Sequence, residues 1–96
     1  MKSVIDGEAR IPITFSYVSE NNRKPSSVQV CGSFDKWQVR HPLTYDPLYS
    51  KWSITLKVKK GTHFYKYIVD GQWVISNSEK TMKDPSGYIN NFIAIG

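Results

Sequence analysis

Residues Lys59 to Trp73 read KKGTHFYKYIVDGQW, and this stretch predicts a β-hairpin. From His63 to Val69 most residues are aromatic or β-branched, which is typical of a strand. Asp70-Gly71 follows, and an Asp-Gly pair between strand-like runs is a strong hairpin signal because a type I′ turn needs positive φ at both central positions. We therefore expect the strand to turn at Asp70-Gly71 and to return through Trp73.

Side chains in this strand alternate between the two faces of the predicted sheet, because successive residues of a strand point in opposite directions. The set predicted to line the core is Tyr65, Tyr67 and Val69, and the set predicted to point outward is Phe64, Lys66 and Ile68. Trp73 follows the turn closely enough to share a surface with Lys66. A cation beside an indole is a candidate ligand site, whereas the alternative is a solvated lysine and a half-buried tryptophan.

Strand-like patterns recur along the rest of the chain, separated by turn formers. We predict them at residues 10–19, 28–32, 43–45, 51–58 and 88–95, with a short partner strand from Trp73 to Ile75. Pro12 cannot donate a hydrogen bond to a sheet, so the first strand is expected to lie at an edge or to begin beyond it. Residues 20–27 and 76–87 are rich in turn formers, and we expect loops there.

Six or seven short strands at this spacing, without a helical period, predict an all-β domain. The predicted fold is an immunoglobulin-like antiparallel β-sandwich, and a five-stranded barrel is the alternative. Trp52 alternates in phase with Ile54 and Leu56, which places it in the core. Trp37 and Trp73 stand at turn edges instead, where we expect both indoles to be exposed.

The composition limits the class of protein. The 96 residues make one domain, which we divide into a polar lead-in at residues 1–9 and a β domain at residues 10–96. Cys31 is the single cysteine, which excludes an internal disulfide, and with His41 and His63 as the only histidines no metal site is expected. The sequence predicts a reducing compartment, the cytoplasm, with the nucleus as the alternative. No apolar run approaches the roughly 20 residues that span a bilayer, so no membrane partner is expected.

The charge balance is moderately basic. The net charge is +5, from 13 lysines and arginines against 8 aspartates and glutamates. A nucleic-acid partner is compatible with this charge but is not favoured, because the basic residues are scattered. Lys57, Lys59 and Lys60 form the only tight cluster.

The sequence favours a binding protein over an enzyme. Neither Cys31 nor any serine stands in a recognisable nucleophile context with His41 or His63. The acidic residues are scattered, and no spacing singles out a pair for acid-base catalysis. Gly32 and Gly71 are isolated turn glycines and do not form a phosphate-binding loop. We therefore expect no catalytic residues and no cofactor.

Several motifs follow one another in a characteristic order. They are Gly32-Ser33-Phe34-Asp35-Lys36-Trp37, Leu43, Trp52, Gly61-Thr62-His63, Tyr65-Lys66-Tyr67, Val69-Asp70-Gly71-Gln72-Trp73 and Asn90-Asn91. In this order they resemble the family 48 carbohydrate-binding modules, in particular the glycogen-binding module of the beta subunit of AMP-activated protein kinase. The resemblance covers Ser27 to Ile95 and implies the early-set form of the immunoglobulin-like sandwich. It also implies a non-catalytic module that binds α-1,4-linked glucan such as glycogen or starch.

The resemblance implies roles for particular residues. The family's two sugar-stacking tryptophans fall on Trp37 and Trp73, its sugar-contacting lysine on Lys66 and its hydrogen-bonding asparagine on Asn90. These residue types suit the task, because an indole can cover the apolar face of a pyranose while lysine and asparagine reach its hydroxyls. Two indoles set at an angle would match the curve of an α-1,4-glucan.

The sequence departs from the family pattern in two respects. In the kinase module a leucine in the loop before the terminal Asn-Asn pair contacts the sugar, and here its position falls on Ser86. Tyr88 is the candidate to replace that apolar contact, so Ser86 and Tyr88 are accessory site candidates. The kinase-subunit region that docks the other subunits is missing from these residues. A chain of these residues alone is therefore not expected to scaffold that kinase, although it could direct a kinase or a glucan-metabolising enzyme to the polymer.

Two other classes of function stay open from the sequence. One is a protein-interaction module that has the same fold without sugar binding. The other is a small nucleic-acid-binding β domain, because scattered lysines and aromatic residues also describe a stacking platform for single strands.

Overall fold

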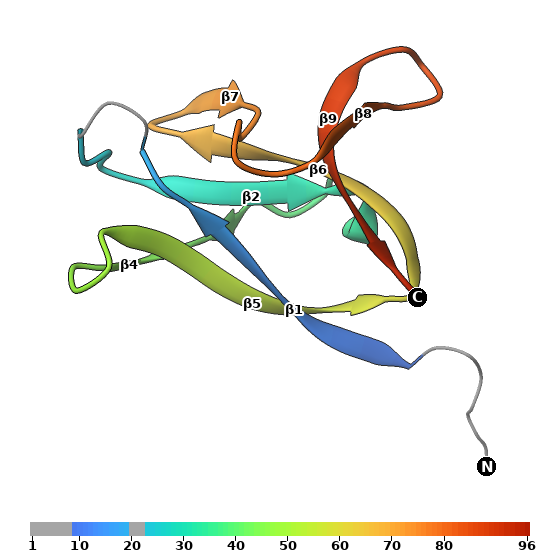
Figure 1. The fold of residues 1–96 in the computed structure, drawn as a ribbon, viewed down its shortest axis with the longest axis horizontal. Coiled ribbons are helices and arrows are strands. Elements are labelled where there is room, and N and C mark those ends of the chain that lie inside the picture. The colour runs from blue at the N-terminus through green and yellow to red at the C-terminus, as the bar shows by residue number, and fades with distance from the viewer. Residues whose placement is uncertain (1–8, 20–22) are drawn as a thin grey trace.

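The computed structural model describes residues 9–19 and 23–96 and shows two antiparallel β-sheets packed as layers (Figure 1). The elements in chain order are β1 (Arg10–Tyr17), β2 (Val28–Gly32), the 3-10 helix η2 (Ser33–Asp35), β3 (His41–Pro42), β4 (Thr44–Asp46), β5 (Lys51–Lys59), β6 (Gly61–Val69), β7 (Gln72–Val74), β8 (Thr81–Lys83) and β9 (Ile89–Ile95). The first sheet has the order β1-β5-β4. The second has the order β3-β2-β6-β9-β8, and β7 also pairs with β6. The predicted all-β, immunoglobulin-like antiparallel sandwich is confirmed. The lead-in predicted at residues 1–9 lies outside the described residues, except for Ala9.

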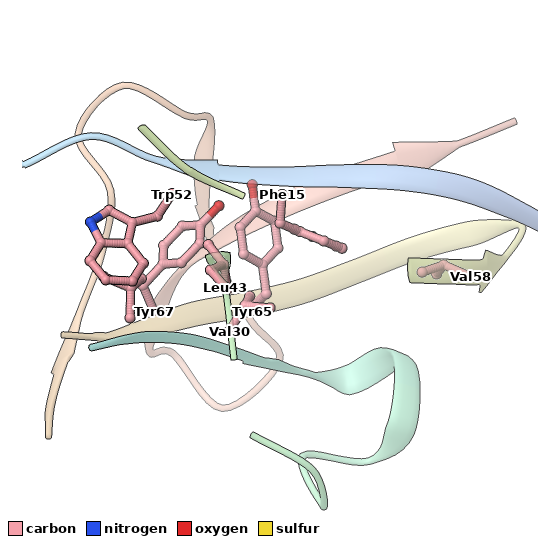
Figure 2. Packing of buried hydrophobic residues seen from close by; sticks show 8 residues of the cluster. Phe15, Val30, Leu43, Trp52, Val58, Tyr65 and Tyr67 are labelled. Carbon is pink, nitrogen blue, oxygen red and sulfur yellow. The ribbon is translucent and has the colours of Figure 1, made fainter. Parts of the chain in front are cut away.

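The hydrophobic core lies between the two sheets, and aromatic side chains fill much of it (Figure 2). Phe15 of β1 meets Tyr65 of β6 edge to face, with ring centroids 4.9 Å apart. Trp52 of β5 is buried and packs against Tyr45, which confirms its predicted place in the core. Tyr67 is completely buried, so this face of β6 lines the core as predicted. The aromatic contacts hold the two sheets face to face.

β1 is an edge strand, as Pro12 predicts. It occupies one end of the first sheet, and Pro12 stands opposite Lys57 of β5. Because proline has no N–H to donate, it fits where one side of a strand faces no further strand. The prediction of an edge position is therefore confirmed.

The strand predicted at residues 43–45 corresponds to β4, and the residues just before it form a further short strand, β3, in the other sheet. β3 pairs with β2 in the second sheet, whereas β4 pairs with β5 in the first. Leu43 lies between them and is buried, and its N–H donates to the Val28 carbonyl at 2.8 Å. The chain therefore crosses from one layer to the other at Leu43, whose side chain joins the core.

The prediction of a loop across residues 76–87 is wrong in part, because β8 lies within it. β8 pairs antiparallel with β9, and Met82 stands opposite Asn90. All three residues of β8 are exposed, so no alternation of apolar residues marks it in the sequence. Its pairing with β9 creates the strand, and the loop between the two projects from the body of the sandwich (Figure 1).

Candidate functional site

Trp73 is presented by the hairpin between β6 and β7. Asp70 (φ 50°) and Gly71 (φ 84°) both have positive φ, as the predicted type I′ turn requires. Trp73 stands opposite Ile68 in the register, so its indole lies on the outer face of the second sheet. The Asp70 carboxylate accepts hydrogen bonds from the N–H groups of residues 26 and 27 at 2.7 and 3.0 Å. The turn is therefore tied to the chain that leads into β2.

Trp37 is presented by a tight turn after β2. Two hydrogen bonds close the 3-10 helix Ser33–Asp35, from the Trp37 N–H to the Gly32 carbonyl at 2.8 Å and from the Lys36 N–H to the Ser33 carbonyl at 3.1 Å. This is the bonding of a Schellman motif, which usually places glycine in the left-handed region. Here Lys36 (φ 61°) and Trp37 (φ 62°) are both left-handed, a strained arrangement for residues with side chains. The turn brings the Trp37 indole beside Trp73.

The two indoles form an exposed and angled pair. Trp37 is 38% exposed and Trp73 is 46% exposed. Their ring centroids lie 6.4 Å apart, and the ring planes are inclined by 50°. Neither ring is enclosed in the core and the two lie side by side, as the sequence led us to expect. The pair offers two adjacent apolar surfaces at an angle to each other.

The sheet face beside the indoles is built by β2 and β6. Lys66 stands opposite Cys31 in the register and shares the outer face with Ile68. Lys66 is half-buried, and Ile68 lies on the outer face as predicted but is completely buried there. The reason is the pairing with β7, which places Trp73 directly opposite Ile68 on the same face.

Asn90 lies on the outer face of β9, because its neighbour Asn91 stands opposite the core residue Tyr65. Asn90 is only 3% exposed. Its Nδ2 donates to Asp84 Oδ2 at 2.8 Å and to the Tyr88 carbonyl at 3.4 Å. Both amide hydrogens are therefore used within the protein, and Oδ1 is the atom through which Asn90 could accept a hydrogen bond from a ligand.

Asp84 organises the loop between β8 and β9. Its Oδ1 accepts hydrogen bonds from the N–H groups of Ser86 and Tyr88 at 2.9 and 3.0 Å. Desolvation acts to raise the pKa of Asp84, but the hydrogen bonds from Tyr88, Asn90, Ser86 and Gly87 outweigh it and lower the pKa below its ordinary value. Ser86 and Tyr88 are both exposed on this ordered loop, so both accessory candidates are accessible.

Residues 11–96 match the family described as the glycogen recognition site of AMP-activated protein kinase. The chain belongs to this family. The match runs from β1 to the last residue and includes both exposed indoles. The resemblance carried by the motifs is therefore confirmed, and the chain is a carbohydrate-binding module of the glycogen-recognition type.

Curated relatives contain the same module within longer proteins. The module is 32% identical over 71 residues, 73% of its length, to Phosphoglucan phosphatase DSP4, amyloplastic, of Castanea sativa. It is 37% identical over 68 residues, 71% of its length, to 5'-AMP-activated protein kinase subunit beta-2 of Homo sapiens. It is 48% identical over 52 residues, 52% of its length, to Protein PTST, chloroplastic, of Arabidopsis thaliana. The matched part makes up 19%, 24% and 19% of these three proteins, so the module spans a quarter or less of each.

Arg40 is a residue beside the indoles that the sequence did not indicate. Its Cζ lies 5.2 Å from the ring centroid of Trp73. Burial raises the pKa of the Cys31 thiol, and Asp35 adds to this increase while the positive charge of Arg40 opposes it. The contact with Trp73 places Arg40 on the same outer face of the module. Its contact joins the loop after Trp37 to β7, and no spacing along the chain reveals such a pairing.

Asp35 and His41 brace the turn that carries Trp37. The Nε2 atom of His41 lies 2.7 Å from Asp35 Oδ2, and the contact is partly buried. It connects the 3-10 helix to β3, so both ends of the intervening loop are held. The sequence alone did not predict this contact, because the spacing between Asp35 and His41 does not belong to a recognised motif.

Asn91 and Glu79 hold the loop between β7 and β8 in the module. Asn91 is completely buried, and it accepts a hydrogen bond from the Ser76 N–H at 2.8 Å and donates to the Ser76 carbonyl at 3.0 Å. The hydroxyls of Tyr65 and Tyr67 each donate to Glu79 Oε1 at 2.9 Å. The pKa of each hydroxyl is raised above its ordinary value. Burial is the larger cause, and the negative charge of Glu79 is the second.

Other possible binding features lie away from the indoles. A cavity of about 350 Å³ is lined in part by Tyr17, Asp70, Gln72 and Val74. Gln72 and Val74 alternate with Trp73 on β7, so the cavity lies on the side of the hairpin opposite the indole. Among residues 9–19 and 23–96, no three His, Cys, Asp or Glu side chains are placed to hold a metal ion, and no helix is long and apolar enough to cross a membrane. Neither indole lines the cavity beside Gln72, and both are exposed.

Proposed function

We propose that the module binds an α-1,4-linked glucan, such as glycogen or starch, across the indoles of Trp37 and Trp73. The observation that carries this proposal is the exposed, angled pair, because each ring can cover the apolar face of one glucose unit. Successive units of an α-1,4 chain turn relative to one another, and two inclined surfaces follow that turn. Lys66 and the Oδ1 atom of Asn90, both on the outer face, supply hydrogen bonds to sugar hydroxyls.

The loop between β8 and β9 supplies accessory contacts in this proposal. Tyr88 is 68% exposed, and its ring can cover a further sugar unit. Ser86, at the family's leucine position, offers a hydroxyl in place of an apolar side chain. The hydrogen bonds to Asp84 order the loop before the ligand arrives, which reduces the entropy lost on binding.

The expected affinity for a short oligosaccharide is weak. Stacking on each indole removes on the order of 100 Å² of apolar surface from water, which contributes about 2.5 kcal/mol before ordering costs. After these costs we expect a dissociation constant of about 10 μM to 1 mM. A branched polymer presents many chain ends, so simultaneous attachment at several sites would raise the apparent affinity.

We infer that the module brings a larger protein to the polymer and catalyses no reaction itself. Its relatives include a kinase beta subunit and a phosphoglucan phosphatase, in which the matched part is 24% and 19% of the chain. A kinase or a glucan-metabolising enzyme is therefore the expected partner. The cytoplasm and, from the names of two relatives, the plastid are the compartments in which the module would meet such a polymer.

Calorimetric titration with maltoheptaose tests the site. Trp37→Ala and Trp73→Ala should each weaken binding about tenfold or more, because each removes one stacking surface. Tyr49→Ala is the matched control, since Tyr49 is 68% exposed in the turn before β5 and its removal should leave the affinity unchanged. Thermal unfolding of each variant shows whether the fold is retained.

The proposal is contradicted if the intact protein shows no binding at millimolar maltoheptaose, or if Tyr49→Ala weakens binding as much as the tryptophan variants do. Lys66→Gln and Asn90→Ala should each weaken binding several-fold, because each removes a hydrogen bond to a hydroxyl. Raising the salt concentration should leave the affinity for this neutral sugar nearly unchanged. A nucleic-acid site would instead weaken steeply with salt.

A further inference from the structure

Positive charge gathers around the paired indoles. The guanidinium of Arg40 lies over Trp73, with Cζ 5.2 Å from the ring centroid. Lys66 stands opposite Cys31 on the same outer face. Lys36 is exposed in the turn that carries the other indole. Of the three cations, Arg40 contacts the platform of the two indoles directly, Lys66 shares its sheet face and Lys36 precedes Trp37 in the chain.

The carboxylates of this region have other partners, although the buried Oδ1 atom of Asp35 has no hydrogen-bond partner among the described residues. Asp35 Oδ2 lies 2.7 Å from Nε2 of His41, and Asp84 accepts hydrogen bonds from its own loop and from Asn90. Within the part of the chain that the structure describes, the three cations of the platform form no ion pair. A neutral sugar gains hydrogen bonds from these side chains but little from their net positive charge, whereas an anionic sugar would also be attracted by that charge.

The position of Arg40 suits the recognition of an oxyanion. A guanidinium is planar and permanently charged, and its five N–H groups point outward in the plane. The edge of the guanidinium can donate two parallel hydrogen bonds to a phosphate. Arg40 is also exposed and long, so a sugar that stacks on Trp73 can displace the guanidinium to the rim of the sugar ring, where the hydroxyl substituents project.

We propose that the site selects α-glucan that carries phosphate monoester groups on its glucose hydroxyls, with Arg40 as the residue that determines this specificity. The inference rests on the proposed function, because the indoles must first hold the sugar chain. Arg40 then discriminates between phosphorylated and neutral chains, and Lys66 adds a second positive charge on the same face.

The test compares maltoheptaose with the same oligosaccharide phosphorylated on one glucose C6 hydroxyl. The intact protein should bind the phosphorylated form about fivefold more tightly at low salt, and the preference should shrink as the ionic strength rises. Arg40→Gln should remove most of the preference, so that the ratio of the two affinities falls to about one whatever the change in affinity for neutral maltoheptaose. Lys57→Gln, the matched control, removes the same charge from an exposed position on β5 in the other sheet and should leave the preference intact.

Equal affinity of the intact protein for the two oligosaccharides would overturn the inference. Equal loss of preference in Arg40→Gln and Lys57→Gln would also overturn it, because net charge would then be the cause. Inorganic phosphate and a single-stranded oligonucleotide serve as competitors, and displacement of the phosphorylated sugar by either at a comparable concentration would overturn the inference in favour of a general anion site. Failure of the proposed function looks different, since neither oligosaccharide would then bind.

Discussion

Gly32 is the residue at which the turn carrying Trp37 leaves the least room. Its backbone is extended (φ −160°), so the conformation itself does not require glycine. A Cβ atom added there would lie 2.4 Å from Cε2 of Phe34 and 2.7 Å from the Phe64 carbonyl oxygen. The glycine is therefore required by the close approach of β6 and of the Phe34 ring. The sequence marks Gly32 as the end of a strand but does not reveal this packing.

Gly32→Ala should lower the free energy of unfolding by about 1 to 3 kcal/mol, because the added methyl group forces Phe34 and the backbone of β6 apart. It should also weaken glucan binding, since the turn holding Trp37 must shift. Urea denaturation measures the first effect and maltoheptaose titration the second. Gly96→Ala is the control, because a Cβ at Gly96 meets no atom within 4 Å. An unchanged unfolding midpoint for Gly32→Ala would contradict the argument.

At the scale of the elements, β9 carries two neighbouring asparagines with different surroundings. Asn90 faces outward and holds Asp84, whereas Asn91 faces inward and holds the loop between β7 and β8. Besides its two bonds to Ser76, the Nδ2 atom of Asn91 lies 3.4 and 3.3 Å from the carbonyl oxygens of Glu79 and Lys80. One strand therefore orders both loops that flank β8.

Asn91→Ala should lower the free energy of unfolding by about 2 to 4 kcal/mol, because it leaves the buried backbone groups of Ser76 without their partner. Asn91→Asp is the matched variant: it keeps the acceptor for the Ser76 N–H but sets an oxygen against the carbonyl groups. It should be at least as destabilising as Asn91→Ala. Chemical denaturation of both variants provides the measurement, and wild-type stability of Asn91→Asp would show that the donated bonds are unimportant.

At the scale of the whole molecule, tyrosine hydroxyls connect the two sheets and a loop. The Tyr67 hydroxyl lies 3.0 Å from the Ser16 carbonyl oxygen in the first sheet and 2.9 Å from Glu79 Oε1. Tyr65 reaches the same carboxylate oxygen. Burial is the main reason that the pKa of each hydroxyl is raised above its ordinary value of 10.0, and the charge of Glu79 adds to it.

The stability of the module should therefore fall in alkali. Up to about pH 10 the two phenols are protonated in both folded and unfolded chains, so they do not make stability depend on pH. Above pH 10 the unfolded chain loses these protons while the folded chain keeps them, and the free energy of unfolding should drop by up to about 2.7 kcal/mol per pH unit for the two groups together. Denaturation curves between pH 9 and about 12 measure the slope.

Tyr67→Phe should reduce that slope by about half, whatever its effect on stability at neutral pH, because one of the two shifted groups is gone. Tyr49→Phe, which removes an exposed hydroxyl, should leave the slope unchanged. If the slope in Tyr67→Phe equalled that of the intact protein, the coupling of folding to this buried phenol would be refuted.

Much of the architecture could be predicted because it follows from short-range rules. Alternation along β6 identified the core face of Tyr65 and Tyr67, and Asp70-Gly71 identified the hairpin that carries Trp73. Pro12 indicated the edge strand, and the phase of Trp52 indicated its burial. Of the candidate site, the sequence and its family resemblance named the two indoles and correctly expected both to be exposed.

Long-range pairing decided the rest. The burial of Ile68, the strand β8, the crossing of the chain at Leu43 and the position of Arg40 over Trp73 all depend on which segment comes to lie beside which. Residue propensity and alternation act over a few neighbours, so they determined most of the strands, the main hairpin turn and the face to which the side chains of β6 point. Packing between segments distant in the sequence determines which segment covers each face of a sheet. It also determines how far apart the two indoles stand. Only the tertiary structure could therefore decide the 6.4 Å spacing and 50° angle of the platform.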